Sequence, residues 1–328
     1  MSRGRIAHVA VLGAGSIGVG FAVAFAAHGV PVVLWDPFPE ALDRARTDLH
    51  RRLRLLADHG LAPGQAAPVR TVESVEEAAS DAALVQECAP ERVEVKRELL
   101  AAAATVVPAV PLASATSAIL PSRIAEGMPA EAAARVLVAH PANPPYLLPV
   151  VELVPGPTTV PEVVRRADEV FRGAGMHPVL VHREVEGFVL NRLQGAVLRE
   201  AYCLVRDGVA SVADVDEVVR SALGRRWSVT GPFETADLNT RGGIASHADK
   251  LGPAYARMGA ERGQHDPWTA ELVSRVTAER RRVLPLDDWD RRVLWRDTAL
   301  AGLTGHWTEI RRADDPAPSS AARDQERP

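Results

Sequence analysis

Short apolar runs alternate with amphipathic stretches through the first 182 residues of the chain. The runs have the length and composition of buried strands, and the stretches between them have helical spacing. Strands are predicted at residues 9–12, 32–35, 83–86, 110–113, 136–139, 150–154 and 179–181. This alternation predicts an α/β domain whose doubly wound parallel sheet is covered by helices on both faces.

The pattern changes after Glu184, where apolar residues recur at helical spacing alone. Helices are expected from Val189 onward and over 212–223, 267–282 and 288–311. The sequence therefore predicts a first domain over 1–183 and a smaller all-helical C-terminal domain over 184–311. Proline, serine, alanine and charged residues dominate 312–328, so a disordered tail is expected there.

The turn after the first predicted strand carries three glycines at the spacing of a dinucleotide fingerprint. It reads Gly13-Ala14-Gly15-Ser16-Ile17-Gly18 and leads into a helix predicted over 16–28. Gly13 allows the tight turn, Gly15 lets the backbone approach a pyrophosphate, and Gly18 lets the helix pack closely on the strand. The amides at the helix N-terminus, around Ser16 and Ile17, would face the phosphate charge. The first domain is therefore expected to be Rossmann-type.

Asp36 ends the next apolar run and identifies the expected cofactor. A carboxylate at this place accepts hydrogen bonds from both ribose hydroxyls and repels a 2′-phosphate, so NAD is predicted rather than NADP. The competing interpretation of the N-terminus is a secretory signal peptide, because Arg3 and Arg5 precede an apolar stretch. His8 and several glycines interrupt that stretch, which favours a cytoplasmic protein.

Composition excludes several function classes. The chain has 38 basic and 42 acidic residues and a net charge of −4, so it offers no broad basic surface for nucleic acid. Its two cysteines, Cys88 and Cys203, form neither a disulfide framework nor a metal-ligand spacing, and no metal is expected. Apolar runs stay short of the roughly 20 residues that span a bilayer, so no membrane role is expected.

Polar residues that suit acid–base chemistry follow two of the predicted strands. Ser117 comes after the strand at 110–113, His140 comes directly after the strand at 136–139, and Glu152 lies twelve residues past the histidine. Ligands of doubly wound sheets bind beyond the carboxyl ends of strands, which is where Ser117 and His140 fall. Oxidation of a secondary alcohol needs a base such as imidazole, and a carboxylate on the other ring nitrogen would orient it. A structural histidine is the alternative for His140.

Several stretches together resemble the 3-hydroxyacyl-CoA dehydrogenase family, over nearly the whole ordered chain. The resemblance is carried by the glycine fingerprint and by 87–96, 114–117, His140-x-x-Asn143-Pro144, Glu152-Leu153 and 187–192. The stretches 86–91, 140–146 and 187–194 are similar to the branch of lambda-crystallin and L-gulonate 3-dehydrogenase.

The resemblance implies roles for individual side chains. Ser117 would contact the substrate oxygen, His140 would be the acid/base, Glu152 its orienting partner, and Asn191 a substrate-positioning amide. Glu91, Lys96 and Asn143 match positions that line the nicotinamide side of the cofactor. An exposed helix lysine is the alternative for Lys96.

Departures from the acyl-CoA members concern the substrate. Those members carry two bulky aromatics after the catalytic histidine, where this chain has Pro141-Ala142. Arg226 and Trp227 precede Gly231, as an arginine and an aromatic do in the branches acting on gulonate and carnitine. A guanidinium can bind a carboxylate bidentately, so Arg226 is the candidate clamp of a free acid, with a surface arginine as the alternative.

The sequence thus predicts an NAD-dependent enzyme that oxidises the 3-hydroxyl of a small hydroxy acid, with L-gulonate as the leading substrate. A 3-hydroxybutyryl-CoA dehydrogenase and an L-carnitine dehydrogenase are the alternatives within the same chemistry, and a crystallin-like NAD-binding structural protein is the alternative outside it. Five of the six tryptophans lie beyond residue 184, which suggests a homodimer through the helical domain, although they also suit a core. Arginines of the helix at 39–60 suit a solvated face or the phosphates of a bulky substrate.

Overall fold

The computed structural model describes residues 7–62, 64–264 and 269–295, together with residues 299, 303, 306 and 309. The chain divides into two compact units, Met1–Arg199 and Glu200–Pro328. The division falls within helix α8 (Leu190–Arg206), so the first turns of that helix belong to the first unit. The sequence-based boundary at 183–184 lies ahead of this helix and stays a prediction.

In the described part of the first unit, eight strands form one sheet in the order β3-β2-β1-β4-β5-β6-β7-β8. Neighbouring strands from β3 to β6 run parallel, and the order reverses direction between β1 and β4. This is the doubly wound arrangement that the sequence predicts. The strands are β1 (Val9–Leu12), β2 (Val32–Trp35), β3 (Val69–Thr71), β4 (Leu84–Glu87), β5 (Leu112–Ser114), β6 (Val136–Pro141), β7 (Val150–Pro155) and β8 (His177–Leu180).

The predicted parallel sheet holds for six of the eight described strands, because β7 pairs antiparallel with β6 and β8 runs parallel to β7. The connection between β6 and β7, residues 142–149, is too short for the crossover that joins parallel neighbours, which takes a dozen or more residues. The chain therefore turns back on itself. In the resulting register His140 lies directly opposite Glu152.

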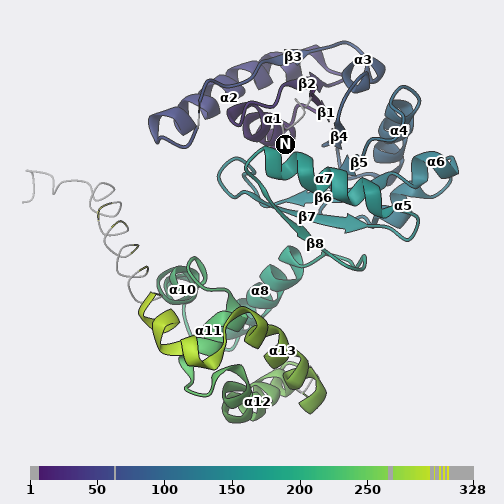
Figure 1. The fold of residues 1–328 in the computed structure, drawn as a ribbon. Helices are drawn as coiled ribbons and strands as arrows, with labels where there is room; N and C mark the ends of the chain where they lie inside the picture. The colour runs from purple at the N-terminus through teal and green to yellow at the C-terminus, as the bar shows by residue number, and fades with distance from the viewer. Residues whose placement is uncertain are drawn as a thin grey trace, which may run out of the picture. The chain divides into compact units, whose positions relative to one another are not determined.

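Helices cover both faces of the sheet (Figure 1). Alternate residues of each strand point to opposite faces, so β1 contributes Val9 and Val11 to one core and Ala10 and Leu12 to the other. The first core packs against α1 (Ser16–Ala27), α2 (Pro39–Asp58) and α7 (Pro161–Gly173). The second packs against α3 (Val75–Ala79), α4 (Val93–Ala104) and α5 (Pro121–Ala125). The short helix α6 (Ala130–Ala133) precedes β6.

Element boundaries differ from the predicted ones by a few residues, and β3 was missed. This strand has three residues and lies at the edge of the sheet, where Arg70 is exposed. A strand that is short and only partly buried carries no continuous apolar run, and such runs are the signal that predicts buried strands.

The regular elements described in the second unit are all helical, as predicted. Its elements after α8 are α9 (Val212–Val218), the π-helix Val219–Gly224, α10 (Arg225–Trp227), α11 (Pro232–Asn239), α12 (Gly243–Glu261), α13 (Ala270–Val283) and the 3-10 turn Leu286–Asp288. The helix expected over 288–311 is described as helical through 289–295, and the tail predicted over 312–328 lies outside the described residues. Among the described helices, none is both long and apolar enough to cross a membrane.

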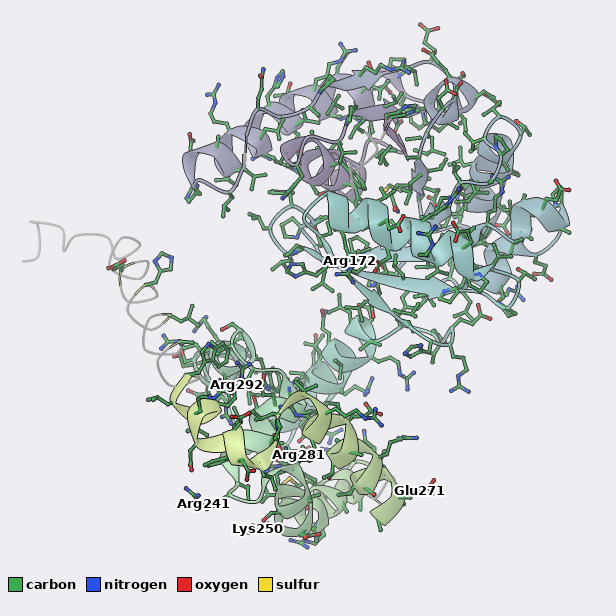
Figure 2. All side chains as sticks on the ribbon, in the orientation of Figure 1. Arg172, Arg241, Lys250, Glu271, Arg281 and Arg292 are labelled. Atoms are coloured by element: carbon green, nitrogen blue, oxygen red, sulfur yellow. The ribbon has the colours of Figure 1, made fainter. Side chains whose placement is uncertain are left out.

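Asp237 of α11 is the centre of a buried ion cluster. Its partner Arg281 is labelled in Figure 2. Asp237 Oδ1 accepts from the Arg281 guanidinium and, at 2.8 Å, from the amide of Ile244, while Arg280 lies 3.5 Å from Oδ2. The Trp289 indole donates to the Asp237 carbonyl at 2.9 Å. Because the carboxylate is fully buried, these partners tie α11, α12 and α13 together.

Candidate functional site

The fingerprint turn adopts the conformation that its glycines allow. Gly13 has φ +114°, and a Cβ there would meet the Cys88 carbonyl oxygen at 2.8 Å. A Cβ on Gly18 would lie 1.9 Å from the Gly13 carbonyl oxygen, so helix and turn are in backbone contact. A Cβ on Gly15 would meet nothing within 4 Å. Gly13 and Gly18 thus build the turn, while Gly15 keeps the space in front of it clear.

A cavity of about 750 Å³ opens on this turn. Its lining includes Gly13 to Ser16, Asp36 with Trp35 and Phe38, and three arginines, Arg44, Arg52 and Arg92. Asp36 follows β2 directly, and its Oδ2 accepts from the Ala14 amide at 2.8 Å while its Oδ1 accepts from the Phe38 amide at 3.0 Å. The carboxylate is therefore held at the rim of the cavity, beside the glycines.

These features fit a bound dinucleotide. The turn offers the free amides of a helix N-terminus, a glycine that leaves room for phosphate, and a carboxylate at the end of the second strand. Ser16 begins α1 at the cavity, and Ile17 packs partly buried against the core beneath it. A cavity of this size also suits a cofactor rather than a small ion.

The acid–base candidates meet at the end of β6. His140 Nδ1 lies 2.8 Å from Glu152 Oε2, and both side chains are almost fully buried. The contact follows from the strand pairing, which places the two residues opposite each other. The Phe188 ring packs beside the imidazole, with ring centroids 5.5 Å apart. The pair is therefore fixed by backbone register and by packing.

The second carboxylate oxygen of Glu152 binds the start of α8. Oε1 accepts from the amides of Val189 at 2.7 Å and Leu190 at 3.0 Å. Gly187 and the fully buried Phe188 both have positive φ, which turns the chain so that these amides face the carboxylate. Burial alone would raise the pKa of Glu152, but the hydrogen bonds from His140, Leu190 and Val189 outweigh it and the pKa lies below its ordinary value. Glu152 is thus held as an anion.

Lys96 of α4 lies in a buried ion cluster, which rules out the exposed helix lysine considered above. Its side chain is 1% exposed, and Nζ lies 3.1 Å from Glu87 Oε1, 3.3 Å from Glu91 Oε2 and 3.1 Å from the Ala89 carbonyl oxygen. Glu87 also accepts from the Ser114 hydroxyl and the Ala89 amide. Burial raises the pKa of Glu87 despite these partners.

Glu91 extends the ion cluster of Lys96 and Glu87 to the turn that contains Ser117. Its Oε1 accepts from the Thr116 hydroxyl, from the Ser117 amide at 3.1 Å and from the Ala118 amide at 3.3 Å. Partial burial would raise the pKa of Glu91, but the bonds from Thr116, Lys96 and Ser117 lower it below its ordinary value. The turn that follows β5 is therefore bonded to Glu91, which in turn pairs with Lys96 of α4.

Asn191, in the first turn of α8, also bonds the turn that contains Ser117. Its Nδ2 donates to the Ser117 carbonyl oxygen at 3.0 Å, and Ser117 itself is exposed. Asn143 is exposed in the connection between β6 and β7. Arg226 belongs to the second unit, where it lies half-buried in α10.

The structure thus connects most of the predicted site residues within the first unit. It also assigns contacts to three residues that have no individual role in the sequence-based prediction, namely Glu87, Phe188 and Arg52. Glu87 ends a buried strand, and an acidic residue in that place is a sequence signal for a functional site. No comparable signal exists for Arg52, which is one of several arginines on α2. Among the described residues, no group of three or more His, Cys, Asp or Glu is placed to hold a metal ion.

The sequence matches two adjoining domain profiles of one family. Residues 8–185 match the profile of the 3-hydroxyacyl-CoA dehydrogenase NAD binding domain, and residues 187–282 match that of the C-terminal domain of 3-hydroxyacyl-CoA dehydrogenase. The two matches meet next to the Gly187–Phe188 turn. Together they cover nearly all of the described chain.

Individual relatives resemble the chain over most of its length. The L-carnitine dehydrogenase of Pseudomonas aeruginosa is 39% identical over 90% of this chain and 92% of its own. The lambda-crystallin of Oryctolagus cuniculus is 34% identical over 90% of this chain and 94% of its own. Among solved structures, an NAD+-dependent 5-formyl-3-hydroxy-2-methylpyridine 4-carboxylic acid 5-dehydrogenase is 28% identical, with a TM-score of 0.69 over 88% of this chain and 98% of its own.

Proposed function

The chain belongs to the 3-hydroxyacyl-CoA dehydrogenase family and is an NAD-dependent dehydrogenase acting on a CH–OH group, and we propose that its substrate is a small free 3-hydroxy acid. The proposal for the chemistry is carried by one observation, the buried hydrogen bond between His140 and Glu152 at the carboxyl end of β6. That edge of a doubly wound sheet is where ligands bind.

In this proposal His140 is the general base. With Nδ1 bonded to Glu152, the Nε2 atom accepts the proton of the substrate 3-hydroxyl. NAD, when bound, accepts the hydride from the carbon that carries this hydroxyl. Glu152 stabilises the imidazolium that forms, and its own negative charge is secured by the amides of Val189 and Leu190.

Ser117 and Asn191 are proposed to position the substrate oxygen. Ser117 lies on the turn beyond β5, which is the parallel neighbour of β6. Asn191 is tied to that turn by its bond to the Ser117 carbonyl. The two polar side chains therefore come from elements that are joined to each other and, through α8, to Glu152.

Glu91, Lys96 and Asn143 are proposed to serve the nicotinamide side of the cofactor site. The burial of Lys96 supports an indirect role, in which its ammonium holds Glu91 in place instead of touching the cofactor. Glu91 is 45% exposed in its side chain and can reach a ligand. Asn143 is exposed in the connection that follows His140.

Two features of the sequence support a free acid over a CoA ester. Pro141-Ala142 stands where acyl-CoA members carry two bulky aromatics, and Arg226 offers a guanidinium that could bind a carboxylate bidentately. The relatives whose names state small substrates, L-carnitine and a pyridine carboxylic acid, are consistent with this. If Arg226→Lys leaves the KM of the best acid unchanged, the clamp is wrong.

L-carnitine and L-gulonate are the two proposed substrates. The similarity to an L-carnitine dehydrogenase favours the first, and the similarity of the stretches 86–91 and 140–146 to the lambda-crystallin branch favours the second. Initial rates of NADH formation with L-carnitine, L-gulonate, free 3-hydroxybutyrate and L-3-hydroxybutyryl-CoA test both, each with NAD and with NADP. A free acid turned over with NAD supports the proposal. Activity confined to the CoA ester refutes the free-acid assignment, and no activity with any of the four compounds refutes both proposed substrates.

A homodimer in the cytoplasm remains part of this proposal. Helix α8 exposes several large apolar side chains, including Leu193, Leu198 and Tyr202. Of the tryptophans cited for an interface, Trp227, Trp289 and Trp295 are exposed or half-buried, and Trp268 and Trp307 lie outside the described residues. Sedimentation equilibrium of the wild-type protein would give the mass of the assembly.

A further inference from the structure

Arg52 of α2 reaches the fingerprint turn from outside it. Its side chain is 11% exposed and lines the same cavity as Gly13 to Ser16. Nη1 donates to the Ser16 carbonyl oxygen at 3.0 Å, and Nη2 donates to the Ser16 hydroxyl oxygen at 3.4 Å. The guanidinium therefore lies beside the first turn of α1, where the fingerprint directs the phosphates of the cofactor.

The helix that receives this phosphate has no cation of its own. Its sequence from Ser16 to Ala27 contains no charged residue. A pyrophosphate brings two negative charges, which the helix N-terminus opposes with about half a positive charge. A planar guanidinium is suited to bind two phosphate oxygens at once. Arg52 brings a guanidinium to the start of this helix, where it is already paired with Asp48 on one side.

Two neighbours hold Arg52 in this position. Asp48, one turn earlier on α2, pairs with its Nη2. Tyr146 presents its ring 5.4 Å from the guanidinium carbon. The same junction is closely packed, because a Cβ on Gly20 would meet Pro145 at 2.8 Å. Arg52 thus lies between α1 and the connection 142–149 that follows His140.

We propose that Arg52 is a pyrophosphate-binding residue of the NAD site. Its guanidinium exchanges the Ser16 hydroxyl for phosphate oxygens and stays anchored by Asp48 and Tyr146. The inference rests on NAD as the cofactor and is independent of which hydroxy acid is the substrate.

Calorimetric titration of the full chain with NAD, ADP-ribose and adenosine tests the proposal, since adenosine lacks the pyrophosphate. Charge-assisted hydrogen bonds contribute enough that Arg52→Gln should weaken binding of NAD and ADP-ribose by about 10- to 100-fold. Adenosine affinity should stay within about twofold. Arg52→Lys keeps the charge and loses the bidentate geometry, so its ADP-ribose affinity should lie between those of the wild type and Arg52→Gln.

Arg51→Gln is the matched control, because Arg51 is the neighbouring arginine, also pairs with Asp48 and is 77% exposed. It should bind all three ligands as the wild type does. The proposal is overturned if Arg52→Gln binds ADP-ribose as tightly as the wild type, or if it loses affinity for adenosine to the same extent. Should Arg52→Gln fail to fold by circular dichroism, wild-type ADP-ribose affinity in Arg52→Lys overturns it equally. Since no substrate is present, the outcome does not depend on the proposed reaction.

Discussion

His140 and Glu152 lie opposite each other in the antiparallel pairing of β6 with β7, with Nδ1 and Oε2 2.8 Å apart. A slip of the register by one residue would move either side chain to the other face of the sheet, so the contact depends on the strand pairing as a whole. The other oxygen of Glu152 binds the amides that begin α8. One carboxylate therefore orients the imidazole and anchors the helix that carries Asn191.

Glu152→Gln should lower kcat by on the order of 10²-fold. The amide oxygen can still accept hydrogen bonds, but a neutral amide cannot stabilise an imidazolium by charge. KM for NAD should change little, since Glu152 lies away from the fingerprint. Steady-state kinetics with the best substrate would measure both constants, and a variant with normal kcat would contradict the role of Glu152.

Glu152 should also make the free energy of unfolding depend on pH. Its folded-state pKa lies below the ordinary value of 4.5, so its contribution is present above about pH 4.5 and is lost as the pH falls toward the folded-state value. Between pH 5 and pH 3, the free energy of unfolding measured in urea should therefore fall less steeply for Glu152→Gln than for the wild type. Glu94→Gln, an exposed glutamate on α4, is the control for removal of one charge. Parallel curves for wild type and Glu152→Gln would contradict the prediction.

Two single-methyl substitutions separate the roles of the fingerprint glycines. Gly18→Ala places a Cβ 1.9 Å from a backbone oxygen and should destabilise the fold by about 1–3 kcal/mol. Gly15→Ala meets open space and should leave the free energy of unfolding within about 1 kcal/mol of wild type, while its methyl group weakens NAD binding. Thermal unfolding and NAD titration of both variants check this. Equal effects of the two on stability would be inconsistent with the packing described.

Lys96→Met should destabilise the protein by about 3–5 kcal/mol, because Glu87 would be left buried without its cation. The double variant Lys96→Met/Glu87→Gln should recover much of this loss, since it removes the unpaired charge. Chemical unfolding of the two single variants and the double variant gives the coupling energy directly. Additive effects would show that the two side chains do not interact.

The sequence was sufficient for the features that depend on local patterns. The fingerprint from Gly13 to Gly18 and the position of Asp36 after β2 follow from the order of strand, turn and helix. The change from strands to helices near Glu184 follows from a change in apolar period. Spacing alone does not distinguish a catalytic His140 from a structural one. The family resemblance is what favours the catalytic role.

Long-range contacts account for what could not be predicted. The partnership of His140 with Glu152 is predicted, but the antiparallel direction of β7 that produces it is not, because apolar patterns do not report strand direction. Lys96 reads as a surface residue of an amphipathic helix until Glu87 is placed beside it. Arg52 acquires a role only when α2 is packed against α1.

The most direct test of the proposed chemistry is single-turnover formation of NADH by wild type and His140→Asn, with the NAD affinity of each measured separately. Because a positioned general base contributes about 10²- to 10⁴-fold, the variant should form NADH slower by that factor while binding NAD as the wild type does. Normal NADH formation by His140→Asn would contradict the assignment of His140 as the base.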